Sequence, residues 1–232
     1  MNSSRPDSGA HSLDSVPFLS SLSPKERGEV ERHCQFREYG PNEKIIQQGD
    51  DVKDVFYLLA GKACVLNYSE TGRAVSYATF GEGEFFGELA AIDGLPRSAW
   101  VWTVSPCTVV VMPGLIFRHM VTSDADLSLA LLRKLADIIR TSDERIAEFG
   151  LLGAEQRMCI ELIRTAEPDP TNPENLIIFP IPTQVHYANV IGSSRETVSR
   201  VFGRLREKGI VRREDKTLYI TDREKLEQSA LF

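Results

Sequence analysis

A long amphipathic stretch near the middle of the chain restricts the folds open to this protein. From Asp124 to Phe149 the positions of one seam follow each other at alternating spacings of three and four residues. These positions are Leu132, Leu135, Ile139, Ser142, Ile146 and Phe149. Such a heptad pattern predicts one long helix whose narrow apolar stripe needs a partner helix. A second copy of the chain is the simplest partner, and packing on the helix's own domain alone is the alternative.

The residues before this helix follow a different pattern. Short β-branched or aromatic segments are separated by glycine or polar turns at roughly ten-residue intervals, which is typical of an antiparallel sandwich or barrel. The segments cover residues 43–50, 54–61, 63–68, 74–80, 99–104 and 108–112. Ahead of them, a helical pattern runs from about Leu22 to Phe36, with Ser23 as N-cap and Pro24 at the first helical position.

The N-terminal stretch MNSSRPDSGAHSLDS is polar and lacks the apolar core of a signal peptide. We therefore expect residues 1–14 to form a disordered leader and the protein to be cytoplasmic. No stretch approaches the roughly 18 apolar residues that a membrane span requires. The cysteines, at positions 34, 64, 107 and 159, form no C-x-x-C pair, so we expect free thiols rather than a zinc or iron–sulfur site.

After the long helix, Gly150 and Gly153 bracket two leucines and suggest a hinge. A second helix is expected over Ala154–Ala166. The composition of residues 167–175 predicts an exposed loop, and residues 177–179 resemble a strand.

Two further helices joined by a short turn are predicted near the C-terminus. Thr183 caps a helix that runs to about Val190, residues 191–193 form the turn, and Ser194 caps a helix from Arg195 to Lys208. Two helices with a short glycine-containing turn are the DNA-binding helix-turn-helix arrangement. Residues 209–211 and 217–220 predict a β-hairpin, the wing, after it. An ordinary helical hairpin with a solvated charged face is the alternative.

The side chains at the start of the second helix suit base recognition. Arginine reads guanine O6 and N7, and glutamate accepts from cytosine N4. Hydroxyl and amide groups contact phosphate oxygens, which fix register rather than sequence. The expected DNA-binding residues are Arg195, Glu196, Arg200, Ser199, Thr197, Ser194, Ser193, Thr183 and Gln184. The chain has a net charge of −6, yet residues 193–216 contain eight Lys and Arg against four acids, which is consistent with a local docking face for nucleic acid.

The stretch GELAAIDGLPRSAW, residues 87–100, contains polar side chains that folding does not require. Gly87-Glu88-Leu89 with Arg97-Ser98-Ala99 resembles the phosphate-binding cassette of cyclic-nucleotide-binding domains. Residues 194–200, SRETVSR, are similar to the recognition helix of regulators of the cyclic AMP receptor type. Over roughly residues 15–225 the chain therefore resembles the Crp/Fnr superfamily of transcriptional regulators.

This resemblance implies an α+β fold with three parts. A cyclic-nucleotide-binding β-barrel (jelly roll) would cover residues 15–123, a dimerisation helix residues 124–150, and a winged helix-turn-helix residues 151–232. Arg97 and Ser98 would bind the cyclic phosphate, Glu88 would accept from the ribose 2′-hydroxyl, and the Thr141-Ser142 pair would meet the adenine edge. The expected nucleotide-binding residues are Gly87, Glu88, Leu89, Arg97, Ser98, Ala99, Thr141, Ser142, Tyr77 and Val65.

The resemblance also implies the ligand and the partners. Cyclic AMP is the expected allosteric ligand, but cyclic GMP shares its phosphate and ribose, so the cassette does not separate the two. The expected partners are a second copy of the chain and a pseudo-palindromic DNA site with TGTGA-like halves. RNA polymerase is a further expected partner, which residues 167–175 would contact. A nucleotide sensor that acts through protein partners is the alternative.

Other chemistry has little support in the sequence. No nucleophile–base constellation or metal-ligand spacing is present, so we expect neither an enzyme nor a metal site. His33 and His119 stand beside no second obvious haem ligand.

Overall fold

The structure is a computed structural model that describes residues 12–68 and 74–231, without the side chains of residues 68, 74–77 and 174. Its contacts divide the chain into two units. The first comprises Met1–Asn67 with Tyr77–Asp137, and the second comprises Tyr68–Ser76 with Ile138–Phe232. No helix in the described ranges is long and apolar enough to cross a membrane.

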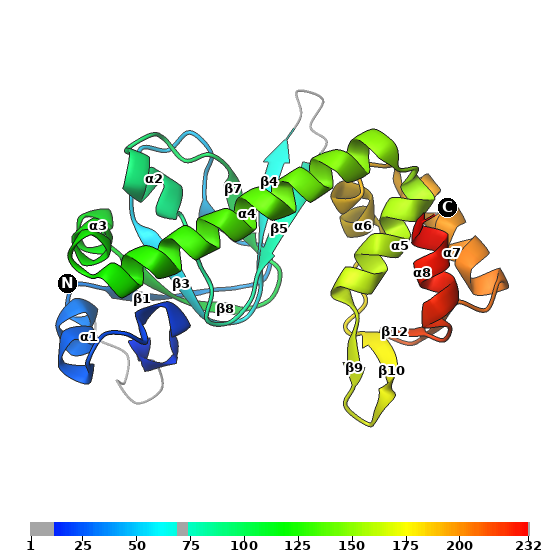
Figure 1. Ribbon diagram of the computed structural model, residues 1–232, viewed down its shortest axis with the longest axis horizontal. Helices are drawn as coiled ribbons and strands as arrows, with labels where there is room; N and C mark the ends of the chain where they lie inside the picture. The colour runs from blue at the N-terminus through cyan, green and yellow to red at the C-terminus, as the bar shows by residue number, and fades with distance from the viewer. Residues whose placement is uncertain (1–11, 69–73, 232) are drawn as a thin grey trace. The chain divides into compact units, whose positions relative to one another are not determined.

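The first unit is built on two four-stranded antiparallel sheets (Figure 1). Their strand orders are β1-β8-β3-β6 and β2-β7-β4-β5. The strands are β1 (Gln35–Tyr39), β2 (Lys44–Ile46), β3 (Val55–Ala60), β4 (Ala63–Tyr68), β5 (Ala74–Phe80), β6 (Phe85–Phe86), β7 (Trp100–Thr103) and β8 (Cys107–Met112). This confirms the expected α+β fold with an N-terminal jelly-roll β-domain, and the predicted strand over residues 43–50 is shorter than expected.

The strand β3 lacks an alternating pattern because both of its faces are buried. Phe56 and Leu58 lie in the core between the two sheets. Val55 and Tyr57 lie in a second core, formed with the helices that cover the outer face of the same sheet. Strands buried on both sides have nearly continuous apolar sequences, as VFYLLA does here.

Short helices contribute to the core on the outer face of the sheet β1-β8-β3-β6: η1 (Leu13–Ser15), η2 (Pro17–Leu19), α1 (Pro24–Glu31), α2 (Glu88–Asp93) and α3 (Gly114–Ser123). The predicted N-cap of α1 is confirmed, because Ser23 and Glu26 form a reciprocal capping box. The helix prediction up to Phe36 is wrong, since Phe36 pairs with Val110 in the sheet.

The predicted leader is described only in part. Residues 1–11 lie outside the described residues. Leu13 is fully buried in the core on the outer face of the sheet. The packed chain therefore begins earlier than residue 15.

The predicted long helix is present as α4 (Ala125–Leu151). Asp124 accepts a hydrogen bond from the Leu127 backbone N–H at 2.9 Å and so begins the helix. Leu127 and Leu131 are buried against the β-domain. The seam positions 132, 139, 146 and 149 are exposed by 62, 60, 70 and 45% respectively, which leaves an apolar stripe available to a partner helix.

The second unit contains α5 (Ala154–Thr165), α6 (Gln184–Val190), α7 (Arg195–Glu207) and α8 (Arg223–Leu231). Its sheet has the order β11-β12-β10-β9, with β9 (Glu167–Asp169), β10 (Asn172–Ile178), β11 (Val211–Glu214) and β12 (Thr217–Ile220). The helix-turn-helix and the second strand of the wing are thus where the sequence predicts them, whereas the first strand lies at Val211–Glu214 and not at residues 209–211. The helix α8 was not expected.

The loop prediction for residues 167–175 is wrong in part. This segment contains β9 and the start of β10, which pair as a hairpin. Asp169 is buried at its tip, where its carboxylate accepts from the Thr171 backbone N–H at 2.8 Å and from the Thr171 hydroxyl at 2.7 Å. Proline and asparagine at a hairpin tip resemble a loop in composition, which explains the error.

Candidate functional site

The cassette begins at a glycine that no other residue could replace without strain. Gly87 lies between β6 and α2 with φ of 84°, in the left-handed region. A Cβ atom added there would be 2.7 Å from Nη1 of Arg97 and 3.0 Å from the carbonyl oxygen of Asp54. Both the backbone conformation and the close approach of Arg97 therefore require glycine.

Arg97 is buried beneath this turn, with 4% of its surface exposed. Its Nη1 donates to the Gly87 carbonyl at 2.8 Å and its Nη2 donates to the Asp54 carbonyl at 2.6 Å. Burial lowers the pKa of Arg97, while the carboxylates of Asp54, Glu88 and Asp50 raise it. An arginine stays protonated in proteins, so the site contains a fixed cation with further N–H donors.

Glu88, the first residue of α2, is also buried, with 5% of its surface exposed. A buried carboxylate is costly unless it has charged or hydrogen-bonding partners. Arg97 and Lys134 are the cations close enough to feel its charge, and the Glu88 carboxylate raises the pKa of each. Glu88 is thus a buried acceptor beside two positive charges.

The other predicted cassette residues divide between surface and core. Ser98 is exposed, and its carbonyl accepts from Nε2 of Gln48 at 3.3 Å. Leu89 is 41% exposed, whereas Ala99 and Val65 lie in the core between the sheets. The side chain of Tyr77 lies outside the described residues.

The predicted pair Thr141-Ser142 is exposed on α4. The Ser142 hydroxyl donates to the Ile138 carbonyl one turn earlier at 2.8 Å, so its own helix satisfies it in the seam. Both residues belong to the second unit and the cassette to the first. Their joint role therefore stays a prediction.

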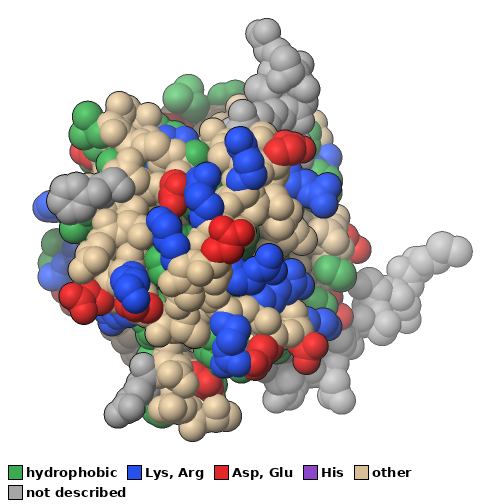
Figure 2. Space-filling model, turned by 90° about the vertical axis from the view of Figure 1, so that its right-hand side faces the viewer, with side chains coloured by type: hydrophobic (Ala, Val, Ile, Leu, Met, Phe, Trp, Pro, Cys, Tyr) green, Lys and Arg blue, Asp and Glu red, His purple; other side chains and the backbone are tan. Residues whose placement is uncertain are grey.

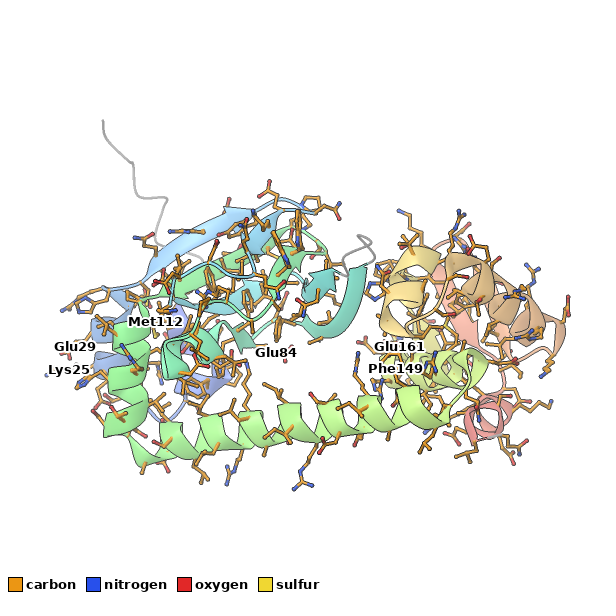
Figure 3. The ribbon with its side chains drawn as sticks, turned by 90° about the horizontal axis from the view of Figure 1, so that it is seen from above. Lys25, Glu29, Glu84, Met112, Phe149 and Glu161 are labelled. Carbon is orange, nitrogen blue, oxygen red and sulfur yellow. The ribbon has the colours of Figure 1, made fainter. Side chains whose placement is uncertain are left out.

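Sequence reasoning missed Lys134 of α4. Its ammonium donates to the Phe85 carbonyl and lies 3.4 Å from the centroid of the Phe85 ring. Burial lowers the pKa of Lys134, and the carboxylates of Glu88 and Glu84 raise it (Glu84 is labelled in Figure 3). Lys134 stands beside the seam position Leu135, where a charged residue is ordinary, so the sequence contained no signal for this contact.

The DNA-facing candidates lie at the start of α7. Its N-cap Ser194 accepts from the Thr197 backbone N–H at 3.2 Å, as predicted. The side chains of Arg195, Glu196, Ser199 and Arg200 are all exposed. Arg200 donates from Nη2 to the Thr197 hydroxyl at 3.1 Å. Hydrogen bonds from its own backbone N–H and from Ser194 lower the pKa of the Glu196 carboxyl, which keeps it an acceptor.

The remaining candidates lie around α6 and the turn. Thr183 caps α6, because its hydroxyl accepts from the His186 backbone N–H at 3.1 Å. Gln184 and Ser193 are half-buried. Figure 2 shows Lys and Arg side chains gathered with acidic groups between them on the face that includes α7 and α8. The wing adds exposed Arg212 and Arg213, which were not among the predicted contacts.

Metal ligands do not gather in the described parts of the chain. There, no group of three or more His, Cys, Asp or Glu side chains could hold a metal ion. Burial raises the pKa of the Cys34 thiol to about 12 and that of the Cys159 thiol to about 11. These thiols are therefore protonated at neutral pH.

Comparisons with known families match both halves of the chain. The family described as "Cyclic nucleotide-binding domain" matches residues 36–124, and the "Crp-like helix-turn-helix domain" matches residues 156–229. The first match includes the whole cassette, and the second includes the whole of α6 and α7.

Similar proteins cover most of the chain. The cAMP-activated global transcriptional regulator CRP of Salmonella typhimurium is 27% identical over 191 residues, which are 81% of this chain and 90% of that protein. A CooA mutant structure from Carboxydothermus hydrogenoformans has a TM-score of 0.76 at 18% identity, over 95% of this chain and 96% of that one. The c-di-GMP responsive regulator CLP of Xanthomonas campestris has a TM-score of 0.72 at 19% identity, over 86% of this chain and 100% of that one. At these identities the two structures show the fold alone.

Proposed function

We propose that this chain, which belongs to the Crp/Fnr family of transcriptional regulators, is a homodimer whose binding to DNA is switched on by cyclic AMP. The observation that supports this most is the buried pair of Glu88 and Arg97 around Gly87. One carboxylate and one cation fit the two polar ends of a cyclic nucleotide, the ribose 2′-hydroxyl and the phosphodiester.

In this proposal each cassette residue has a separate task. Arg97 turns N–H donors toward the cyclic phosphate as a bidentate pair, and Ser98 donates a further hydrogen bond. Gly87 allows the backbone to come close, and Glu88 accepts from the ribose hydroxyl. The helix α2 has six residues, so its dipole adds little and the arginine supplies most of the charge. Leu89, Ala99, Val65 and Tyr77 line the pocket.

Hydroxyl groups at the purine edge do not by themselves select one base, because a hydroxyl both donates and accepts hydrogen bonds. Thr141 and Ser142 would meet the adenine edge, and the CRP relative is named cAMP-activated. Cyclic GMP is the rival, since it has the same phosphate and ribose. Isothermal titration of the purified protein with each nucleotide tests this choice. Micromolar binding of cyclic AMP alone supports the proposal, comparable binding of both makes the purine site permissive, and no binding of either contradicts it.

On the DNA side, Arg195, Glu196 and Arg200 would read the bases of TGTGA-like half-sites. Ser199, Thr197, Ser194, Ser193, Thr183 and Gln184 would hold the backbone. Packing of two α4 helices along the seam would place two recognition helices about 34 Å apart, one turn of DNA. Each base contact is worth about 1–3 kcal/mol of discrimination. Unchanged specific binding by an Arg195→Ala variant would favour a sensor that acts through protein partners.

The link between the two sites is a change in the packing of α4. A nucleotide that contacts both the β-domain and α4 favours one arrangement of the seam over another, and this differential contact is what allosteric coupling requires. We further propose that the protein acts in the cytoplasm and contacts RNA polymerase through residues 167–175. A pull-down of polymerase by the DNA-bound protein, compared with a variant in which these residues are replaced by Gly and Ser, tests that contact.

A further inference from the structure

A cavity of about 140 Å³ lies inside the second unit, between α5, α8 and the sheet. Protein interiors contain few voids larger than one water molecule, so a space of this size is uncommon in a packed core. Figure 1 shows α5 and α8 side by side, and the two helices are in contact. Three pairs of residues line the cavity: Ile163 and Ala166, Leu176 and Ile220, and Arg223 and Leu226.

Residue spacing explains the two helical walls of the cavity. Ile163 and the C-cap residue Ala166 are three positions apart at the end of α5, so they lie on one side of that helix. Arg223 and Leu226 have the same spacing at the start of α8. Ala166 contributes only a methyl group, whereas the other residues of the walls have larger side chains. The space between the two helices is therefore left unfilled at this position.

The sheet closes the cavity from a third side. Leu176 of β10 and Ile220 of β12 are directly opposite each other in neighbouring strands, so their side chains share one face of the sheet. Ile220 and Leu226 are buried and form the floor, whereas Leu176 is half-buried. Arg223 is exposed, so the opening lies at the start of α8. The cavity is thus a pocket with an aliphatic interior and a guanidinium at its mouth.

The size and lining of the pocket define the apolar part of a ligand. Five of its six lining side chains are aliphatic and offer no hydrogen bond to a water molecule. An apolar cavity of about 150 Å³ stays free of water and binds benzene. A hydrocarbon group of about six carbon atoms therefore matches the interior of this pocket.

Arg223 defines the polar part of the ligand. Its Nε donates to the Glu227 carboxylate at 2.7 Å, which uses one of the five N–H groups of the guanidinium. A carboxylate on the ligand can accept from the two terminal nitrogens as a fork. The side chain of Arg223 is 65% exposed, so this ion pair adds selectivity rather than most of the affinity.

We propose that this pocket is a second ligand site, which binds a short-chain aliphatic carboxylate. The hydrocarbon chain fills the cavity, and the carboxylate pairs with Arg223. The lining residues come from α5, α8 and the sheet and its ends, not from α6 or α7, so an occupied pocket leaves the predicted DNA contacts accessible. The site is separate from the cassette of Glu88 and Arg97, and it does not require a cyclic nucleotide.

Methyl NMR of the full chain, without nucleotide or DNA, tests the location of the ligand. Titration with hexanoate should shift the methyl signals of Ile163, Leu176 and Ile220. The signals of Val109 and Val111, in the core of the β-domain, should stay unchanged. Absence of shifts at the lining methyl groups, or shifts confined to the β-domain, overturns the proposal.

Two further probes test the charge of the ligand in the same titration. Hexanamide has nearly the same shape as hexanoate without its charge, and it should bind about fivefold more weakly, because one exposed ion pair supplies up to about that factor. Hexylamine has the opposite charge and should bind more weakly than hexanamide. Equal affinities for the three probes overturn the assignment of a carboxylate.

Variants of α8 test the role of Arg223. Arg223→Gln should weaken hexanoate binding about fivefold and change hexanamide binding by less than about twofold. Glu227→Gln removes the competing carboxylate and should strengthen hexanoate binding. Lys225→Gln is the matched control, because it removes a cation from the same helix that does not line the cavity. Equal hexanoate affinities in Arg223→Gln and Lys225→Gln overturn the pairing with Arg223.

A variant that fills the cavity tests the apolar part of the site. Ala166→Leu adds three carbon atoms to the wall and should abolish the binding of both hexanoate and hexanamide. Unchanged binding by a folded Ala166→Leu protein overturns the pocket. If this variant fails to fold, the methyl shifts and the α8 variants still decide the proposal. Because every measurement is made without cyclic AMP, a failure of the proposed function leaves this test unaffected.

Discussion

Substitution of Gly87 by alanine should separate the nucleotide site from the stability of its scaffold. Alanine in the left-handed region costs about 1–2 kcal/mol. The added Cβ also lies 2.7 Å from Nη1 of Arg97, so the guanidinium must move away from the turn. Loss of one charge-assisted hydrogen bond to the phosphate costs about 1.5–3 kcal/mol. Nucleotide affinity should therefore fall roughly tenfold to a hundredfold.

Gly94 provides the matched control at the other end of α2. It has φ of 74°, close to the 84° of Gly87, but a Cβ atom there meets nothing within 4 Å. Both alanine variants should lower the unfolding midpoint through the same backbone strain. Isothermal titration should show a large loss of cyclic AMP binding for Gly87→Ala and a change within about threefold for Gly94→Ala. Equal losses in the two variants would refute the steric argument.

Three further predictions concern the other parts of the molecule. In fluorescence anisotropy, Arg195→Ala should weaken specific duplex binding by about 1–3 kcal/mol and leave non-specific binding unchanged. Arg206→Ala on the same helix is the control, and equal effects of the two variants would count against base recognition by Arg195. Ile139→Glu on the exposed seam should shift the protein to monomers in sedimentation, whereas Arg140→Glu beside it should leave the dimer intact. If the Ile139→Glu variant stays dimeric, the seam is not the dimer interface. Burial raises the pKa of Glu161, so its contribution to stability is present below its ordinary pKa of 4.5 and is lost as pH rises through the higher folded value. Glu161→Gln should remove this pH dependence in denaturant unfolding, and parallel pH profiles for the two proteins would show the shift to be absent.

The parts of the fold that the sequence predicts are those with local chemical causes. Ser23, Thr183 and Ser194 each cap a helix as expected, because capping depends on a few neighbouring residues. The heptad spacing predicts α4 to within two residues at its C-terminal end. Gly87 and Arg97 were found as a pair because a recurrent motif places them at a fixed spacing.

The features that were missed depend on contacts between distant segments. The helical pattern was extended to Phe36, into the first two residues of β1, yet pairing with β8 decides the conformation of this strand. The contact of Lys134 with the Phe85 carbonyl joins residues 49 positions apart, and nothing in either local sequence indicates it. Composition suggested a hinge at Gly150 and Gly153, which stays a prediction, but it did not indicate the contacts of Arg157 with the Phe149 ring and the Leu152 carbonyl beside them.

One selection experiment tests most directly whether cyclic AMP controls sequence-specific DNA binding by this protein. Purified protein would be used to select duplexes from a random-sequence pool, with and without cyclic AMP, and the selected pools would be sequenced. A dimer whose DNA binding requires cyclic AMP should enrich a two-fold-symmetric motif with half-sites one helical turn apart, and only when cyclic AMP is present. Enrichment of the same motif without nucleotide, or of no motif in either pool, would contradict it.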